Sequence, residues 1–210
     1  MKTGAKILHA NTRLGYRTGL AALLLVLLTS GGAGAQDKPV ERLDHAVARG
    51  GNLAQLEPLR LAIDQRLLLA QGVARAKWNA RAQVEDLPRE AQVIRAAVEQ
   101  GAALGLPASW IEAVFRAQIE ASKTVQRELF AQWRAQQVDR FADAPDLAKT
   151  VRPELDRLTA QILRSMLDNQ SVLRDPARTS GVARALGALE ARTLSPAAAE
   201  QALAPFQSQQ

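Results

Sequence analysis

The stretch LRLAIDQRLLLAQGVARAK, residues 59–77, decides the fold class. Its positions recur at helical spacing and share one face: Leu59, Ile63, Arg66, Ala70, Val73 and Lys77. Nowhere does the rest of the chain alternate apolar and polar residues over a sustained run, as a half-buried strand would. The sequence therefore predicts an all-α protein.

Two cations interrupt this apolar face. Arg66 and Lys77 are eleven residues apart, which is about 16 Å along a helix axis. Buried cations without partners are destabilising, so the pattern predicts an anion or water between them, beside the smaller Ala70 and Val73. The alternative is that both side chains extend along the helix to solvent, and the spacing alone favours neither interpretation.

A second amphipathic stretch has a polar centre. Its face reads Ile111, Phe115, Gln118, Ser122, Gln126, Leu129 and Trp133. Ser122 and Gln126 are four residues apart and point the same way. They either bond to each other or to nearby backbone, or they contact a polar ligand. Two helices with polar breaks of complementary chemistry favour a pocket inside a helical bundle.

Glycine and proline divide the chain into about six helices of one bundle. Proline is favoured in the first turn of a helix, and Gly50-Gly51 and residues 143–146 read as breaks. After a short first segment at 39–49, the expected helices cover 53–82, 88–104, 107–136 and 153–169, with two short helices after Pro176 and Pro196.

Residues 1–35 are predicted to be a cleaved signal peptide. Four basic and no acidic residues accompany the apolar run at 19–29, and the segment ends in Ala33-Gly34-Ala35. The run is shorter than the ~20 residues that a membrane-spanning helix needs, although a retained anchor is the alternative. Cleavage near Ala35 would make the mature protein, residues 36–210, periplasmic or secreted.

Composition excludes several kinds of site. The chain has no cysteine, and its two histidines are His9 in the leader and His45, which excludes thiol nucleophiles and histidine-rich metal sites. The full chain has 27 basic and 21 acidic residues; without the leader's four basic residues the net charge falls from +6 to +2. Scarce aromatics and this small charge argue against nucleic-acid binding.

The segments DQRLLLAQGVARAKW and KWNARAQVEDLPRE resemble the all-helical chorismate mutase family, and its secreted subclass in particular. The resemblance rests on the spacing of six positions: Arg66, Lys77, Asp86, Arg89, Ser122 and Gln126. Glu90 follows Arg89 as in some members. The similarity is specific over residues 58–136 and looser over the C-terminal helical half, 137–210.

The resemblance implies a cofactor-free and metal-free rearrangement of chorismate to prephenate, a step of aromatic amino-acid biosynthesis. Arg66 and Arg152 would bind the two carboxylates, with Arg157 or Arg164 as substitutes for Arg152. Lys77 and Gln126 would donate to the ether oxygen. Glu90 or the backbone near Asp86 would hold the ring hydroxyl, and Arg89 and Ser122 would support the substrate. The secreted relatives also imply a homodimer with self-contained sites.

Three alternatives remain at this point. An isochorismate–pyruvate lyase would share the helical architecture and basic pocket. A periplasmic helical binding protein would have no chemistry, but its polar groups would lie on an exposed face rather than within apolar stripes. For Asp86 alone, a helix N-cap is as good an interpretation as a substrate contact.

Overall fold

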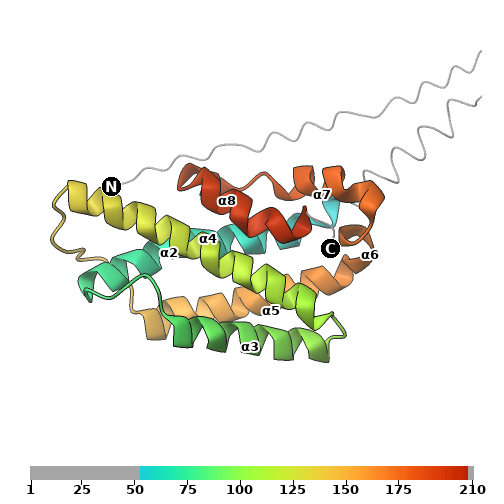
Figure 1. Ribbon diagram of the computed structural model, residues 1–210, viewed down its shortest axis with the longest axis horizontal. Helices are drawn as coiled ribbons and strands as arrows, with labels where there is room; N and C mark the ends of the chain where they lie inside the picture. The colour runs from blue at the N-terminus through green and yellow to red at the C-terminus, as the bar shows by residue number, and fades with distance from the viewer. Residues whose placement is uncertain (1–52, 208–210) are drawn as a thin grey trace, which may run out of the picture. The chain divides into compact units, whose positions relative to one another are not determined.

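The computed structural model describes residues 53–207, and every element in that range is helical (Figure 1). This confirms the all-α prediction. The predicted leader and the short segment at 39–49 lie outside the described residues. The four long helices are α2 (Glu57–Asn79), α3 (Leu87–Ala103), α4 (Ala108–Ala135) and α5 (Arg152–Asp168).

Proline and glycine set the helix boundaries largely as expected. Pro58, Pro88 and Pro153 occupy first turns, where the missing N–H leaves no intrahelical hydrogen bond unmade. The helix expected at 53–82 is too long, because Arg81 adopts a left-handed conformation (φ 54°) just after α2. That turn lets the Ala82 N–H donate to the Lys77 carbonyl and closes the helix end.

The C-terminal half contains more elements than the sequence suggests. A π-helical turn, η1 (Leu147–Val151), precedes α5, and Asp146 caps it by accepting from the N–H groups of Ala148 and Lys149. The other elements there are short: α6 (Gln170–Leu173), η2 (Pro176–Arg178), α7 (Thr179–Leu186), η3 (Glu190–Thr193), α8 (Pro196–Leu203) and η4 (Ala204–Phe206). Single turns such as α6 are too short to produce a recognisable hydrophobic period.

Helix α4 forms the middle of the bundle (Figure 1). It packs on α2, α3 and α8, while α5 packs on α2 and α3. The α8 face is almost entirely alanine, with Ala198, Ala199 and Ala202 fully buried, so its backbone comes close to α4. No helix in the described range is long and apolar enough to cross a membrane.

The segment after α4 is fastened to the end of α2. The Asn79 side chain accepts from the Phe141 N–H (2.9 Å) and donates to its carbonyl oxygen (2.7 Å). The Trp78 indole N–H donates to the carbonyls of Val138 and Asp139. These contacts fix the course of the chain from α4 to η1, and so determine where α5 begins.

A buried carboxylate joins α2 to the C-terminal half. Asp64 is 4% exposed, and its two oxygens accept from the N–H groups of Glu190 (3.0 Å) and Ala191 (2.9 Å) at the start of η3. Both N–H groups belong to a first turn and have no helical acceptor. The N-terminal motif region and the final third of the chain are therefore linked through one side chain.

We expect Asp64→Ala to lower the free energy of unfolding by about 2–4 kcal/mol, because two N–H groups would lose a charged acceptor. Urea denaturation measures this. The matched control is Asp175→Ala, which removes a more exposed cap on Ala177 and should lose only about 0.5–1 kcal/mol. Equal losses in the two variants would contradict the linking role of Asp64.

Candidate active site

A cavity of about 150 Å³ lies among α2, α3, α4 and α5, with the 84–86 turn and η1 completing its wall. All eight residues that the sequence singles out line it: Arg66, Lys77, Asp86, Arg89, Glu90, Ser122, Gln126 and Arg152. The structure thus brings the eight together in one chain. Their roles toward a ligand remain predictions.

Arg66 is a buried cation, and no carboxylate in residues 53–207 lies within hydrogen-bonding distance of it. Its side chain is 8% exposed and lies over the Phe115 ring, 5.6 Å from the centroid. One terminal nitrogen, Nη1, donates to the Leu155 carbonyl (3.2 Å) and to Thr159 Oγ1 (3.4 Å) on α5. Burial lowers the pKa of Arg66 to about 10, so it stays charged at neutral pH. The alternative that Arg66 extends to solvent is wrong.

Lys77 is partly buried at the other end of the same face. Its ammonium donates to the Val84 carbonyl in the turn that leads to α3. Burial lowers the pKa of Lys77, and the nearby carboxylates of Asp86, Glu90 and Glu85 counteract this only in part. An ammonium has three donors, so two remain for a ligand after the bond to Val84.

The start of α3 presents Asp86, Arg89 and Glu90 to the cavity. Asp86 is the N-cap, because its carboxylate accepts from the Arg89 N–H (3.2 Å). Glu90 Oε1 in turn accepts from the Asp86 N–H (3.0 Å). The N-cap interpretation of Asp86 is therefore confirmed, and the cap also places Arg89 and Glu90 along the cavity.

The polar side chains at the centre of α4 meet only part of their hydrogen-bonding capacity within the helix. Gln126 Nε2 donates to Ser122 Oγ at 3.0 Å, so of the alternatives left open by the sequence the bond between the two side chains is present. Gln126 is nevertheless 3% exposed, and its Oε1 has no hydrogen-bond partner in the described part of the chain. Gln118 is different, because its amide donates to the Ala202 carbonyl of α8 (2.9 Å).

Among the three candidate arginines of the C-terminal half, only Arg152 lines the cavity. Arg157 and Arg164 face elsewhere on α5 and pair with Glu154 (2.6 Å) and Asp168 (3.2 Å). Arg152 stands at the first position of α5, directly after η1. Its place therefore depends on the anchored segment between α4 and α5.

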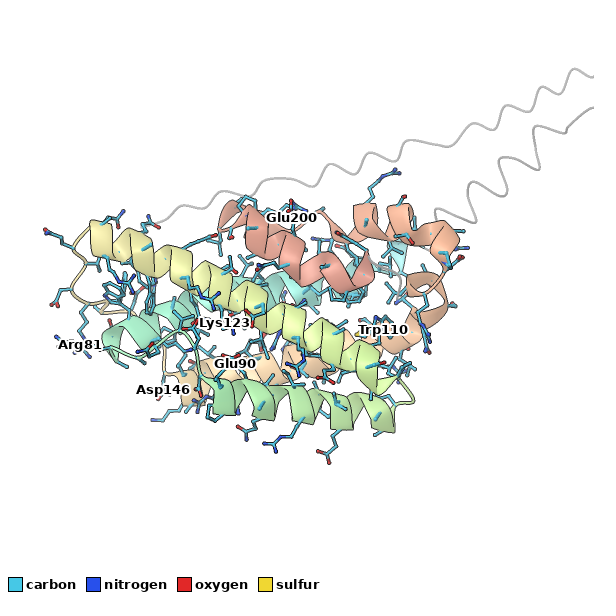
Figure 2. The ribbon with its side chains drawn as sticks, viewed as in Figure 1. Arg81, Glu90, Trp110, Lys123, Asp146 and Glu200 are labelled. Carbon is cyan, nitrogen blue, oxygen red and sulfur yellow. The ribbon has the colours of Figure 1, made fainter. Side chains whose placement is uncertain are left out.

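Sequence reasoning missed Lys123, Asp156 and Thr159. Lys123 is 7% exposed on α4, and Figure 2 labels it near Glu90 of α3. Its ammonium lies 3.0 Å from Glu90 Oε2 and 2.6 Å from Glu120 Oε1. Burial alone would lower the pKa of Lys123, but these two bonds raise it. A lysine beside an apolar stripe reads as solvent-facing, and its partner Glu90 is 33 residues away in the sequence.

The lining residues give the cavity a surplus of positive charge. Five are cations (Arg66, Lys77, Arg89, Lys123, Arg152) and three are anions (Asp86, Glu90, Asp156), so the formal net charge is +2. Neutral donors and apolar side chains such as Val73, Val93 and Ile119 fill the remaining wall. This lining suits a small, partly apolar dianion.

Residues 59–127 match the family model described as chorismate mutase type II. The secreted chorismate mutase of Mycolicibacterium smegmatis is 32% identical over 145 residues, which is 69% of this chain and 78% of that protein. The secreted enzyme of Mycobacterium tuberculosis is 27% identical over 139 residues, covering 66% of this chain and 69% of its own.

Solved structures agree with this match. The crystal structure of chorismate mutase from Burkholderia thailandensis has a TM-score of 0.64 at 35% identity and covers 72% of this chain and 98% of its own. That of the Burkholderia phymatum enzyme has a TM-score of 0.63 at 32% identity, with 75% and 99% covered. Sequence and structure together show that the chain belongs to the chorismate mutase family.

Proposed function

We propose that the cavity is the active site at which this protein, a chorismate mutase, rearranges chorismate to prephenate. The observation that carries the proposal is the convergence of eight motif residues on one cationic cavity. The reaction breaks the ether C–O bond and forms a C–C bond within one molecule. The enzyme therefore has to hold the substrate in its reactive conformation and stabilise the charge that develops on the ether oxygen. It needs no nucleophile and no proton transfer.

The two carboxylates of chorismate are bound by Arg66 and Arg152 in this proposal. Arg66 uses Nη1 for its bonds to α5, which leaves Nε and Nη2 for a carboxylate. The α5 contacts hold the guanidinium plane before substrate arrives, so little side-chain entropy is lost on binding. Arg152 approaches from the first turn of α5, which lets one short segment position both cations.

Lys77 and Gln126 stabilise the ether oxygen as its bond to the ring breaks. Lys77 keeps two donors free after its bond to Val84. A half-turn of the Gln126 amide would let its orphaned Oε1 accept from the Ser122 hydroxyl and turn its NH₂ group toward the substrate. Both donors would then act in a partly enclosed site, where such hydrogen bonds are stronger than in bulk water.

The start of α3 holds the ring hydroxyl. Each oxygen of the Glu90 carboxylate already accepts one hydrogen bond, from the Asp86 N–H and from Lys123. A carboxylate oxygen accepts more than one, so Glu90 can also accept from the hydroxyl without losing its orientation. Asp86 contributes by capping the helix, and Arg89 and Ser122 support the substrate from either side.

We further propose that the protein is exported like its secreted relatives, with the leader removed near Ala35 and residues 36–210 forming the mature enzyme. Because one chain supplies all eight residues, each protomer of a homodimer would carry a self-contained site. An isochorismate–pyruvate lyase and a non-catalytic binding protein are not favoured by the family match.

Purified protein is expected to convert chorismate to prephenate without releasing pyruvate, and Lys77→Ala and Gln126→Ala should each lower kcat by about 10²–10³-fold. Loss of chorismate absorbance, with separate assays for prephenate and pyruvate, measures this. Arg157→Ala, an exposed cation outside the cavity, is the control and should keep kcat within about twofold. Near wild-type kcat in either cavity variant would remove that residue from the mechanism.

The pH profile should be flat on the acid side and fall on the alkaline side. The amide of Gln126 donates at any pH, so kcat should change by no more than about threefold between about pH 5 and 8. Lys77 must be protonated to donate; since burial lowers its pKa, kcat/KM should fall with a midpoint below the ordinary lysine value of 10.5. A steep loss of kcat between pH 5 and 8 would contradict the role of Gln126.

Arg152→Ala should raise KM by about 10–100-fold, because one carboxylate of the substrate would lose a charge-assisted pair. Arg164→Ala, on the same helix but paired with Asp168 at the surface, should leave KM within about twofold. Steady-state kinetics of the two variants decides the assignment. If the Arg164 variant were the impaired one, the C-terminal cation of the site would have to be reassigned.

A further inference from the structure

Lys123 is a buried cation that the motif does not account for. It lies on α4 one residue after Ser122, lines the cavity and is 7% exposed. Lysine is rarely buried, because removing an ammonium from water is unfavourable unless partners compensate. Here two carboxylates do so, from Glu90 (3.0 Å) and from Glu120 (2.6 Å).

The two carboxylates differ in their relation to the cavity. The Glu90 side chain lines it and is 17% exposed, whereas that of Glu120 is 53% exposed and does not line it. Water screens the Glu120 charge far more than that of Glu90. Within the cavity, the negative charge that Lys123 offsets is therefore that of Glu90.

The charge balance of the lining gives this pair its significance. With Lys123 the lining residues carry +2, and without it they would carry +1. A dicarboxylate substrate carries −2, and Glu90 would repel it if nothing offset that carboxylate. Lys123 and Glu90 are both largely shielded from water, unlike the exposed Asp86, Arg152 and Asp156, so the charges of this pair act more strongly on binding than those three.

We propose that Lys123 is an electrostatic positioning residue, which neutralises Glu90 so that the cavity keeps the two net positive charges that a dicarboxylate requires. The inference rests on the proposed function, because it takes chorismate as the ligand. Lys123 acts on Glu90 and on the field of the cavity, while Lys77 and Gln126 serve the breaking bond. Its removal is therefore a defect in binding and appears in KM much more than in kcat.

The first test is Lys123→Met, with protein expressed from the full sequence. We expect KM for chorismate to rise about tenfold, while kcat changes by less than about threefold. The matched control is Arg116→Met, which removes one cation from an exposed pair with Glu112 on the same helix. Its KM should stay within about twofold of wild type.

The decisive test adds Glu90→Gln. Glu90→Gln alone changes a residue that the proposed function places at the ring hydroxyl, so the double variant Lys123→Met/Glu90→Gln is compared with Glu90→Gln and not with wild type. Because Lys123 acts by offsetting the Glu90 charge, its removal should raise KM by less than about threefold once that charge is gone. A side chain needed only for packing would raise KM equally in both backgrounds. If Lys123→Met fails to fold, Lys123→Gln, which also removes the charge, replaces it in both backgrounds.

A KM for Lys123→Met equal to that of the Arg116 control would overturn the proposal, as would a KM that rises about tenfold when Lys123→Met is added to Glu90→Gln. The wild-type assay separates this from the proposed function. Wild-type protein that forms no prephenate would contradict both the proposed function and the role of Lys123. Normal wild-type turnover with an unaffected Lys123→Met variant would sink only the role of Lys123.

Discussion

A guanidinium buried without a carboxylate beside it constrains much of this structure. Arg66 points inward from α2, and its only hydrogen bonds in the described chain are to a carbonyl and a hydroxyl of α5. Those groups hold its orientation, and the Asp156 carboxylate, which is not hydrogen-bonded to it, offsets its charge only in part. The bundle must therefore keep α5 packed on α2, and must keep open a space in which an anion can complete the pair.

Contacts made by α2 position the C-terminal half so that α5 packs on α2. Trp78 and Asn79, at the end of α2, bind the backbone of the segment after α4 and so direct it back across the bundle. Asp146 then starts the helical turn that leads into α5, where Arg152 and the partners of Arg66 are found. Asp64 ties the same helix α2 to η3, farther along the chain. One helix thus organises both the motif region and the half that completes the cavity.

Local patterns predict the helices and the inward-facing polar residues, because a stripe at helical spacing records which face is buried. That is why Arg66, Lys77, Ser122 and Gln126 are recognisable from the sequence alone. The spacing shared with the family adds Asp86, Arg89 and Glu90. Lys123 cannot be recognised from the sequence because its burial depends on a partner on another helix. Asp64 cannot be recognised either, because the N–H groups that donate to its carboxylate lie more than 120 residues away. The one-turn elements cannot be predicted because they are too short to show a hydrophobic period.

The bond from Gln118 to Ala202 has a practical consequence for handling the protein. Gln118 lines the cavity, and the carbonyl that holds its amide lies in α8, eight residues before the last residue of the sequence. An affinity tag fused to that end would begin close in the sequence to the helix whose backbone holds the Gln118 side chain. A tag placed ahead of Leu53 keeps the fusion point away from α8 in the sequence.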